Sequence, residues 1–166
     1  SDVCSSDLTV VLILILLTIL DNSLMPFLAI KHIYPSLVFI FVVFYSIING
    51  NVSAVYVGVF SGLLQDVYIM NGIGINMFIN MVICLIAAEI GKNIFKDKSV
   101  IPIITCFGLS ILKGILMFII LYLVGQRFYV NTILYVSLYN MIISILIYKK
   151  VYRLCQKDFM IKKWRF

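Results

Sequence analysis

The stretch Gly58-Val-Phe-Ser-Gly-Leu-Leu-Gln-Asp-Val-Tyr-Ile-Met-Asn-Gly-Ile-Gly74 contains the motif around which the chain is arranged. Gly58, Gly62 and Asp66 follow one another at intervals of four residues, which places them on one face of a helix. Two glycines on one face let a second backbone approach closely, as between membrane helices. The acid ends this glycine face just before Asn71-Gly72, a turn signal. The spacing predicts a helix-packing seam that ends in an interfacial carboxylate, and contact with a partner is the alternative for these residues and for Gly72 and Gly74.

The composition around this motif is that of a membrane protein. The chain has 166 residues, of which 63% are apolar and 12% are charged, and its mean hydropathy is +1.14. Soluble domains carry roughly 25% charged residues. A chain with so few charges cannot coat a water-soluble surface, so we predict an integral membrane protein with a single domain.

The apolar segments predict an all-α, polytopic bundle of six helices. We expect these helices at residues 8–30, 35–48, 52–65, 74–90, 100–124 and 130–148. A continuous helix over residues 36–65 would be about 45 Å long, against a hydrocarbon core of about 30 Å. The turn-like cluster Asn49-Gly50-Asn51 therefore predicts two short helices, and the bundle would have five helices if this segment were continuous.

The two ends of the chain differ from the apolar middle. Residues 1–7 are polar and resemble translated adapter sequence, so we expect them to be non-native. Residues 8–148 form the predicted transmembrane helical domain. Seven of the 13 lysines and arginines follow Ile147, so we expect residues 149–166 to form a basic cytoplasmic tail. The tail favours a lipid bilayer surface over nucleic acid as its partner.

The sequence contains no pattern that predicts catalysis. His32 is the only histidine, and the four cysteines have no ligand-like grouping, so we expect no catalytic residues, no metal site and no cofactor. Few polar residues are left to line a ligand pocket. Ionisable side chains within a membrane are usually functional or paired, and two of them need a partner.

These two side chains are Asp21 and Lys113. In the six-helix arrangement they lie about 20 Å and about 21 Å from the cytoplasmic start of their helices, at a rise of ~1.5 Å per residue. Opposite charges at one level predict an intramembrane charge pair. The alternative is that Lys113 extends towards the interface while Asp21 is neutral and bonded to Asn22 or Ser23.

The motifs together resemble those of the MreD family of bacterial cell-shape proteins. They are Gly58-x3-Gly62-Leu63-x2-Asp66, then Asn71-Gly72-Ile73-Gly74, a helix opened by Pro35 and a first helix that ends near Leu24-Met25-Pro26-Phe27. The resemblance extends over nearly the whole chain from Leu8, and its specific part is residues 35–74. One departure is Ser36, because the family often has an acid after this proline.

The resemblance implies a non-enzymatic scaffold in the bacterial plasma membrane, within the wall-elongation machinery. It implies an MreC-type bitopic partner and, through it, a connection between the MreB filament and the wall synthases RodA and a class B penicillin-binding protein. The family also resembles the substrate-binding subunits of energy-coupling-factor vitamin transporters in its six-helix architecture. A small-molecule transporter subunit is therefore the alternative function.

Overall fold

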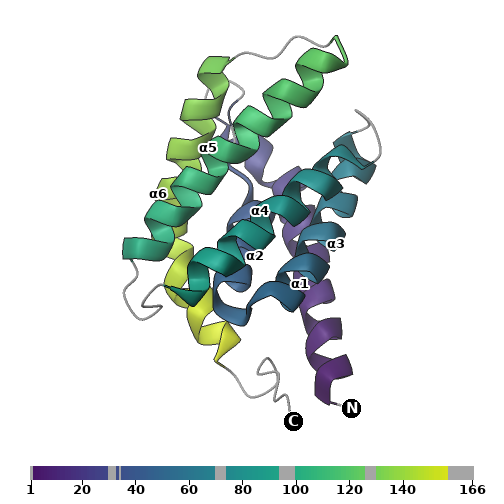
Figure 1. Cartoon of the computed structure of the whole chain (residues 1–166), viewed down its shortest axis with the longest axis vertical. Coiled ribbons are helices and arrows are strands. Elements are labelled where there is room, and N and C mark those ends of the chain that lie inside the picture. Colours follow the sequence, from purple (N-terminus) through teal and green to yellow (C-terminus); the bar gives the residue numbers. More distant parts are fainter. Residues whose placement is uncertain are drawn as a thin grey trace.

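A computed structural model of the chain describes residues 2–29, 33, 35–69, 74–93, 100–125 and 130–156 (Figure 1). Within this part the predicted all-α bundle of six helices is confirmed. A short 3₁₀ helix, η1 (Met25–Leu28), follows the first helix. The six α-helices are α1 (Asp2–Ser23), α2 (Leu37–Asn49), α3 (Asn51–Ile69), α4 (Ile75–Lys92), α5 (Val100–Leu123) and α6 (Val130–Cys155).

Gly50 separates α2 from α3 and decides for six helices rather than five. Its φ of 86° lies in the left-handed region, where glycine pays no steric penalty. Its N–H donates to the carbonyl of Ser46 at 3.1 Å, which ends α2. Its own carbonyl accepts from the N–H of Ala54 at 3.0 Å, which begins α3. The chain therefore reverses at one residue with no loop.

Helix α2 is the core of the bundle. Ten consecutive residues, 38–47, are buried, and α2 packs against all five other α-helices. A helix that is apolar on every side belongs in an interior, because no face of it suits water. Phe44 meets Tyr148 of α6 edge to face, with ring centroids 5.0 Å apart.

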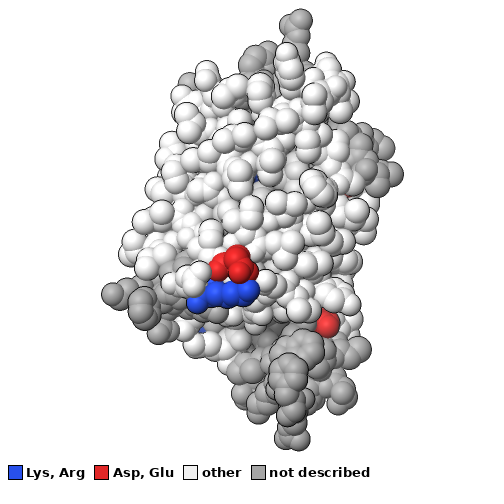
Figure 2. All heavy atoms as spheres, in the orientation of Figure 1, with Lys and Arg blue, Asp and Glu red and all other residues white. Residues whose placement is uncertain are grey.

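The outside of the bundle is suited to lipid. By length and composition, α4, α5 and α6 of the described residues are able to cross a membrane. Figure 2 shows a face on which uncharged side chains predominate around one small acid–base cluster. Helix α1 exposes an apolar stripe at helical spacing, made of Leu8, Leu12, Leu16 and Ile19. These observations agree with the predicted membrane protein.

The helices alternate in direction, so that α1 begins and α6 ends at the same end of the molecule (Figure 1). Contacts support this placement, since Asn49 at the end of α2 bonds the Sγ of Cys155 at 3.7 Å. Asn51 at the start of α3 bonds Glu89 near the end of α4 at 3.0 Å. We call this end the basic end, because it carries Lys92, Lys149, Lys150 and Arg153.

Several helix ends differ from the predicted ones. Helix α1 stops at Ser23 rather than at residue 30, because Pro26 lies in the 3₁₀ turn that follows. Helix α3 continues to Ile69, because no breaker occurs before Asn71. Helix α6 continues to Cys155, so the first residues of the predicted basic tail are helical. Helix α1 includes residues 2–7, which the sequence predicts to be non-native.

Candidate functional site

The glycine face of α3 packs directly on α4. A Cβ added to Gly58 would lie 2.8 Å from the Cα of Met81 and 3.0 Å from the carbonyl oxygen of Asn80. At Gly62 it would lie 2.5 Å from the carbonyl oxygen of Asn76. Real Cβ atoms do not come so close to backbone, so a side chain at either position would push the helices apart. Of the two predicted contacts for these glycines, the structure places them at a helix contact within the chain.

Asp66 lies at the end of this seam and caps α4. Its Oδ2 accepts from the backbone N–H of Gly74 at 2.8 Å and of Met77 at 3.1 Å. Its Oδ1 accepts from the backbone N–H and from Nδ2 of Asn76, both at 3.0 Å. The first N–H groups of a helix have no partner within the helix, and they attract negative charge. Asp66 is only 4% exposed, and both oxygens of its carboxylate are hydrogen-bonded within the chain.

Gly74 contributes to the same turn. It is the N-cap of α4, and its φ of 104° lies in the left-handed region that favours glycine. Its N–H is one of the donors to Asp66. Gly72, which the sequence analysis grouped with it, lies outside the described residues.

Asp21 caps the N-terminus of α2, as Asp66 caps that of α4. Its Oδ1 accepts from the backbone N–H of Leu37 at 2.8 Å, and its Oδ2 accepts from that of Val38 at 3.1 Å. The hydroxyl of Ser36 donates to the same Oδ2 at 3.1 Å. Ser36 is also the N-cap of α2, since its Oγ accepts from the N–H of Phe39 at 3.3 Å. At the position where the family often has an acid, a hydroxyl serves as the cap.

The two caps form a repeated arrangement that was not predicted from the sequence. In each case an acid near the end of one helix binds the first N–H groups of the next helix. Both caps lie at the end of the bundle opposite the basic end, where α1 and α3 finish. The available signal was an acid in the last two turns of an apolar helix, 8 to 17 residues before its targets.

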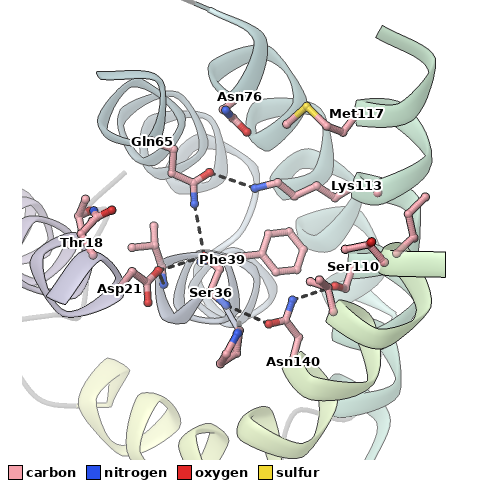
Figure 3. A pocket seen from close by; sticks show the side chains of 17 residues that line it. Thr18, Asp21, Ser36, Phe39, Gln65, Asn76, Ser110, Lys113, Met117 and Asn140 are labelled. Carbon is pink, nitrogen blue, oxygen red and sulfur yellow. Dashed lines mark hydrogen bonds between the residues drawn. The ribbon is translucent and has the colours of Figure 1, made fainter. Parts of the chain in front are cut away.

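The side chain of Lys113, on α5, reaches residues of α3 and α4 inside the bundle. Its Nζ donates to Oδ1 of Asn80 at 2.8 Å. It also donates to Oε1 of Gln65 at 3.0 Å (Figure 3). It also lies 5.0 Å from the ring centroid of Phe39, within the range of a cation–π contact. Asn80 and Gln65 are bonded to each other at 3.0 Å, so the cation has a pre-formed pair of amide oxygens.

The predicted partners Asp21 and Lys113 line one cavity but do not bond to each other. In the part of the chain that the structure describes, the ion pair is the one between Lys92 and Glu89. Asp21 is bonded to the start of α2, and Lys113 is bonded to the two amides. That the two charges stabilise one another across the cavity stays a prediction.

This cavity has a volume of about 340 Å³ and is lined by α1, α2, α5 and α6 together with Gln65 and Asn76. Its polar wall includes Asn140, whose Oδ1 accepts from the N–H of Ser36 at 3.0 Å and whose Nδ2 donates to Ser110 at 2.9 Å. Its apolar wall consists of Phe39, Met117, Ile133 and Val136. The expectation that too few polar residues remain to line a pocket is wrong, because single polar residues on separate helices converge here.

The other groups of the described part give no further candidate. No set of three or more histidine, cysteine, aspartate or glutamate side chains that could hold a metal occurs among these residues. Cys84, Cys106 and Cys155 are free and buried. The arrangement therefore consists of close helix contacts, two carboxylate caps and a cavity with polar lining.

Comparison with known proteins identifies one matching family. The model described as rod shape-determining protein MreD matches residues 5–158. No curated protein and no solved structure matches the chain. The matched range contains the glycine seam, both carboxylate caps and every residue that lines the cavity.

Proposed function

This chain belongs to the MreD family of rod shape-determining proteins, and from that premise we propose that it acts as a non-enzymatic scaffold of the wall-elongation machinery. The family supports a role in rod shape determination, and together with the apolar helices it supports a multi-pass protein of the inner membrane. The finer proposal is that the bundle holds an MreC-type bitopic protein. Through that protein it links the wall synthases, RodA and a class B penicillin-binding protein, to the MreB filament.

The observation that carries the proposal is the enclosure of α2. Its ten buried residues are held from every side, and its first turn is fixed by Asp21. A scaffold needs a body that keeps its shape while its outer faces are in contact with other chains. The outer faces of α1, α5 and α6 are apolar, as a partner's membrane helix requires.

We place the basic end in the cytoplasm. Lys92, Lys149, Lys150 and Arg153 are exposed there, whereas Lys113, the remaining lysine of the described residues, lines the cavity. Lysine and arginine near the ends of membrane helices accumulate on the cytoplasmic side. A reporter that is active only in the cytoplasm, fused after Phe166, should be active, and activity of a reporter that works only outside would refute this orientation.

Copurification tests the scaffold role. The tagged full chain, expressed in a rod-shaped bacterium and extracted in mild detergent, should retain an MreC-type protein, identified with an antibody against it. Gly62→Leu should lose this partner together with the fold, and Gly108→Leu should keep the fold, because a Cβ at Gly108 meets nothing within 4 Å. The family match gives no support to the transporter alternative. Retention of an ATPase-coupling subunit in place of the MreC-type protein would contradict the scaffold role.

A further inference from the structure

Lys113 does not use all of its hydrogen-bonding capacity within the chain. An ammonium group has three N–H donors. Two of them bond Asn80 and Gln65, which are neutral amides, and the third has no hydrogen bond among the described residues. A cation among neutral partners in a membrane protein is costly, since neither amide compensates its charge.

Ser110 provides a second unused hydrogen-bond donor on the wall of the cavity. Its Oγ accepts from Nδ2 of Asn140 at 2.9 Å, and its hydroxyl proton has no acceptor in the described part of the chain. Ser110 and Lys113 are three residues apart on α5, so they lie on one face of that helix. Both line the cavity (Figure 3). The unused capacity on this wall consists of donors, which suit an acceptor with negative charge.

The acids near Lys113 have their own targets. Asp21 lines the same cavity, and its oxygens accept three hydrogen bonds at the start of α2. Asp66, beyond Asn76, accepts four at the start of α4. A carboxylate has about four acceptor positions. Both carboxylates are thus directed at helix N-termini and not at the ammonium group.

The rest of the cavity is apolar. Met117, Ile133 and Val136 form the wall beyond Lys113, and the cavity is as large as a small-molecule pocket, which begins at about 300 Å³. Such a volume holds an anionic group and part of an apolar body. A wholly polar ion would leave the apolar wall without contacts.

We propose that this cavity binds the anionic head of an amphiphilic molecule, a carboxylate or phosphate, with Lys113 as its counter-charge and Ser110 as a second donor. The apolar body of the molecule lies along Met117, Ile133 and Val136. The molecule comes either from the membrane as a lipid or from water as a free anion. The site is separate from the scaffold role, and its absence would leave that role unaffected.

Binding is tested on the purified full chain in detergent with three probes, oleate, oleyl alcohol and inorganic phosphate. Native mass spectrometry counts bound molecules, and the melting temperature reports their affinity. We expect one oleate per chain with a raised melting temperature, and at least tenfold weaker binding of oleyl alcohol, which lacks the charge. Binding of oleate but not of phosphate assigns a lipid-like ligand, whereas phosphate bound as tightly as oleate would show that the apolar wall contributes nothing and would overturn the proposal.

Lys113→Met removes the charge at similar length and should weaken oleate binding at least tenfold. Lys92→Met is the matched control, because Lys92 is exposed at the basic end and should leave binding unchanged. If Lys113→Met does not fold, Val136→Trp fills the apolar wall while Lys113 stays, and it should abolish binding. Equal binding of oleate and oleyl alcohol, or unchanged oleate binding in either cavity variant, would overturn the proposal.

Discussion

Asp66 and Asp21 cap helices in the same way but in different surroundings. Asp66 is 4% exposed, and beside it Gly58 and Gly62 bring α3 against α4. Asp21 is partly buried and faces a cavity of about 340 Å³. We call the first region, Asp66 with the α3–α4 seam, the closed side, and the second, Asp21 with the cavity and Lys113, the open side.

The difference shows that a carboxylate cap does not by itself determine whether the helices around it pack tightly or leave a cavity. On the closed side the residues opposite are glycines, so two backbones meet with no side chains between them. On the open side polar side chains separate the backbones, because Lys113 of α5 reaches Asn80 of α4 and Asn140 of α6 bonds Ser110 of α5, and a space remains beside them. The closed side therefore holds the fold, and the open side is left for binding.

The largest expected effect is that of Gly62→Leu on the closed side. Its side chain would enter the backbone of α4 near Asn76, and we expect a cost above about 3 kcal/mol, beyond the usual range for overpacking. We expect a loss of monodisperse folded protein, measured by size-exclusion chromatography in detergent. Gly108→Leu makes the same change in open space on α5 and should keep the wild-type profile. A normal profile for Gly62→Leu would show that α3 and α4 do not meet there.

Asp66→Ala should have the next largest effect. It leaves the first N–H groups of α4 without acceptors in a buried place, and we expect a loss of roughly 2–3 kcal/mol in the free energy of unfolding. Denaturant titration of the purified protein measures it. Asp66→Asn keeps one acceptor oxygen and should cost less than Asp66→Ala. Equal losses would mean that the charge, and not the acceptor geometry, stabilises the turn.

Asp21→Ala should cost less than Asp66→Ala, about 1 kcal/mol, in the same titration. Its donors face the cavity, where water can replace the lost acceptor. This difference between two chemically identical caps is the direct consequence of the open and closed surroundings. A loss as large as that of Asp66→Ala would show that the cavity does not admit water.

The smallest effect concerns the charge pair. A double-mutant cycle of Lys113→Met with Asn80→Ala should give a coupling of about 1 kcal/mol, because the two groups are bonded at 2.8 Å. The cycle with Asp21→Asn should give a smaller value. Recovery of folded protein by the exchange Asp21→Lys with Lys113→Asp would instead show that the two charges depend on each other.

The sequence predicts the helices well because each helix depends on local signals. The break at Gly50 was predicted from Asn49-Gly50-Asn51, and the structure supplies the positive φ that requires it. The glycine face of α3 follows from its spacing of four. Gly91, whose backbone meets that of Ile47, has no second glycine four residues away, so its close contact was not predicted.

The cavity could not be predicted because its partners lie far apart in the chain. Ser36 and Asn140 are 104 positions apart, and Lys113 and Gln65 are 48 positions apart. Hydrophobic periodicity defines which face of a helix is buried, but not the height at which two helices meet. Counting residues from the start of each helix placed Asp21 and Lys113 at the same depth. It could not show that the first N–H groups of α2 lie close to Asp21 and bind it.

The contrast between the two sides is tested most directly by labelling two matched cysteines with a water-soluble thiol reagent. Thr132→Cys lies on the open side and Ser61→Cys on the closed side, since Thr132 lines the cavity and is partly buried whereas Ser61 is fully buried. Both are made in a background without the four native cysteines. The cysteine at position 132 should react in the folded protein and be protected by oleate, while that at 61 should react only after unfolding. Labelling of both positions, or of neither, would contradict the division into an open side and a closed side.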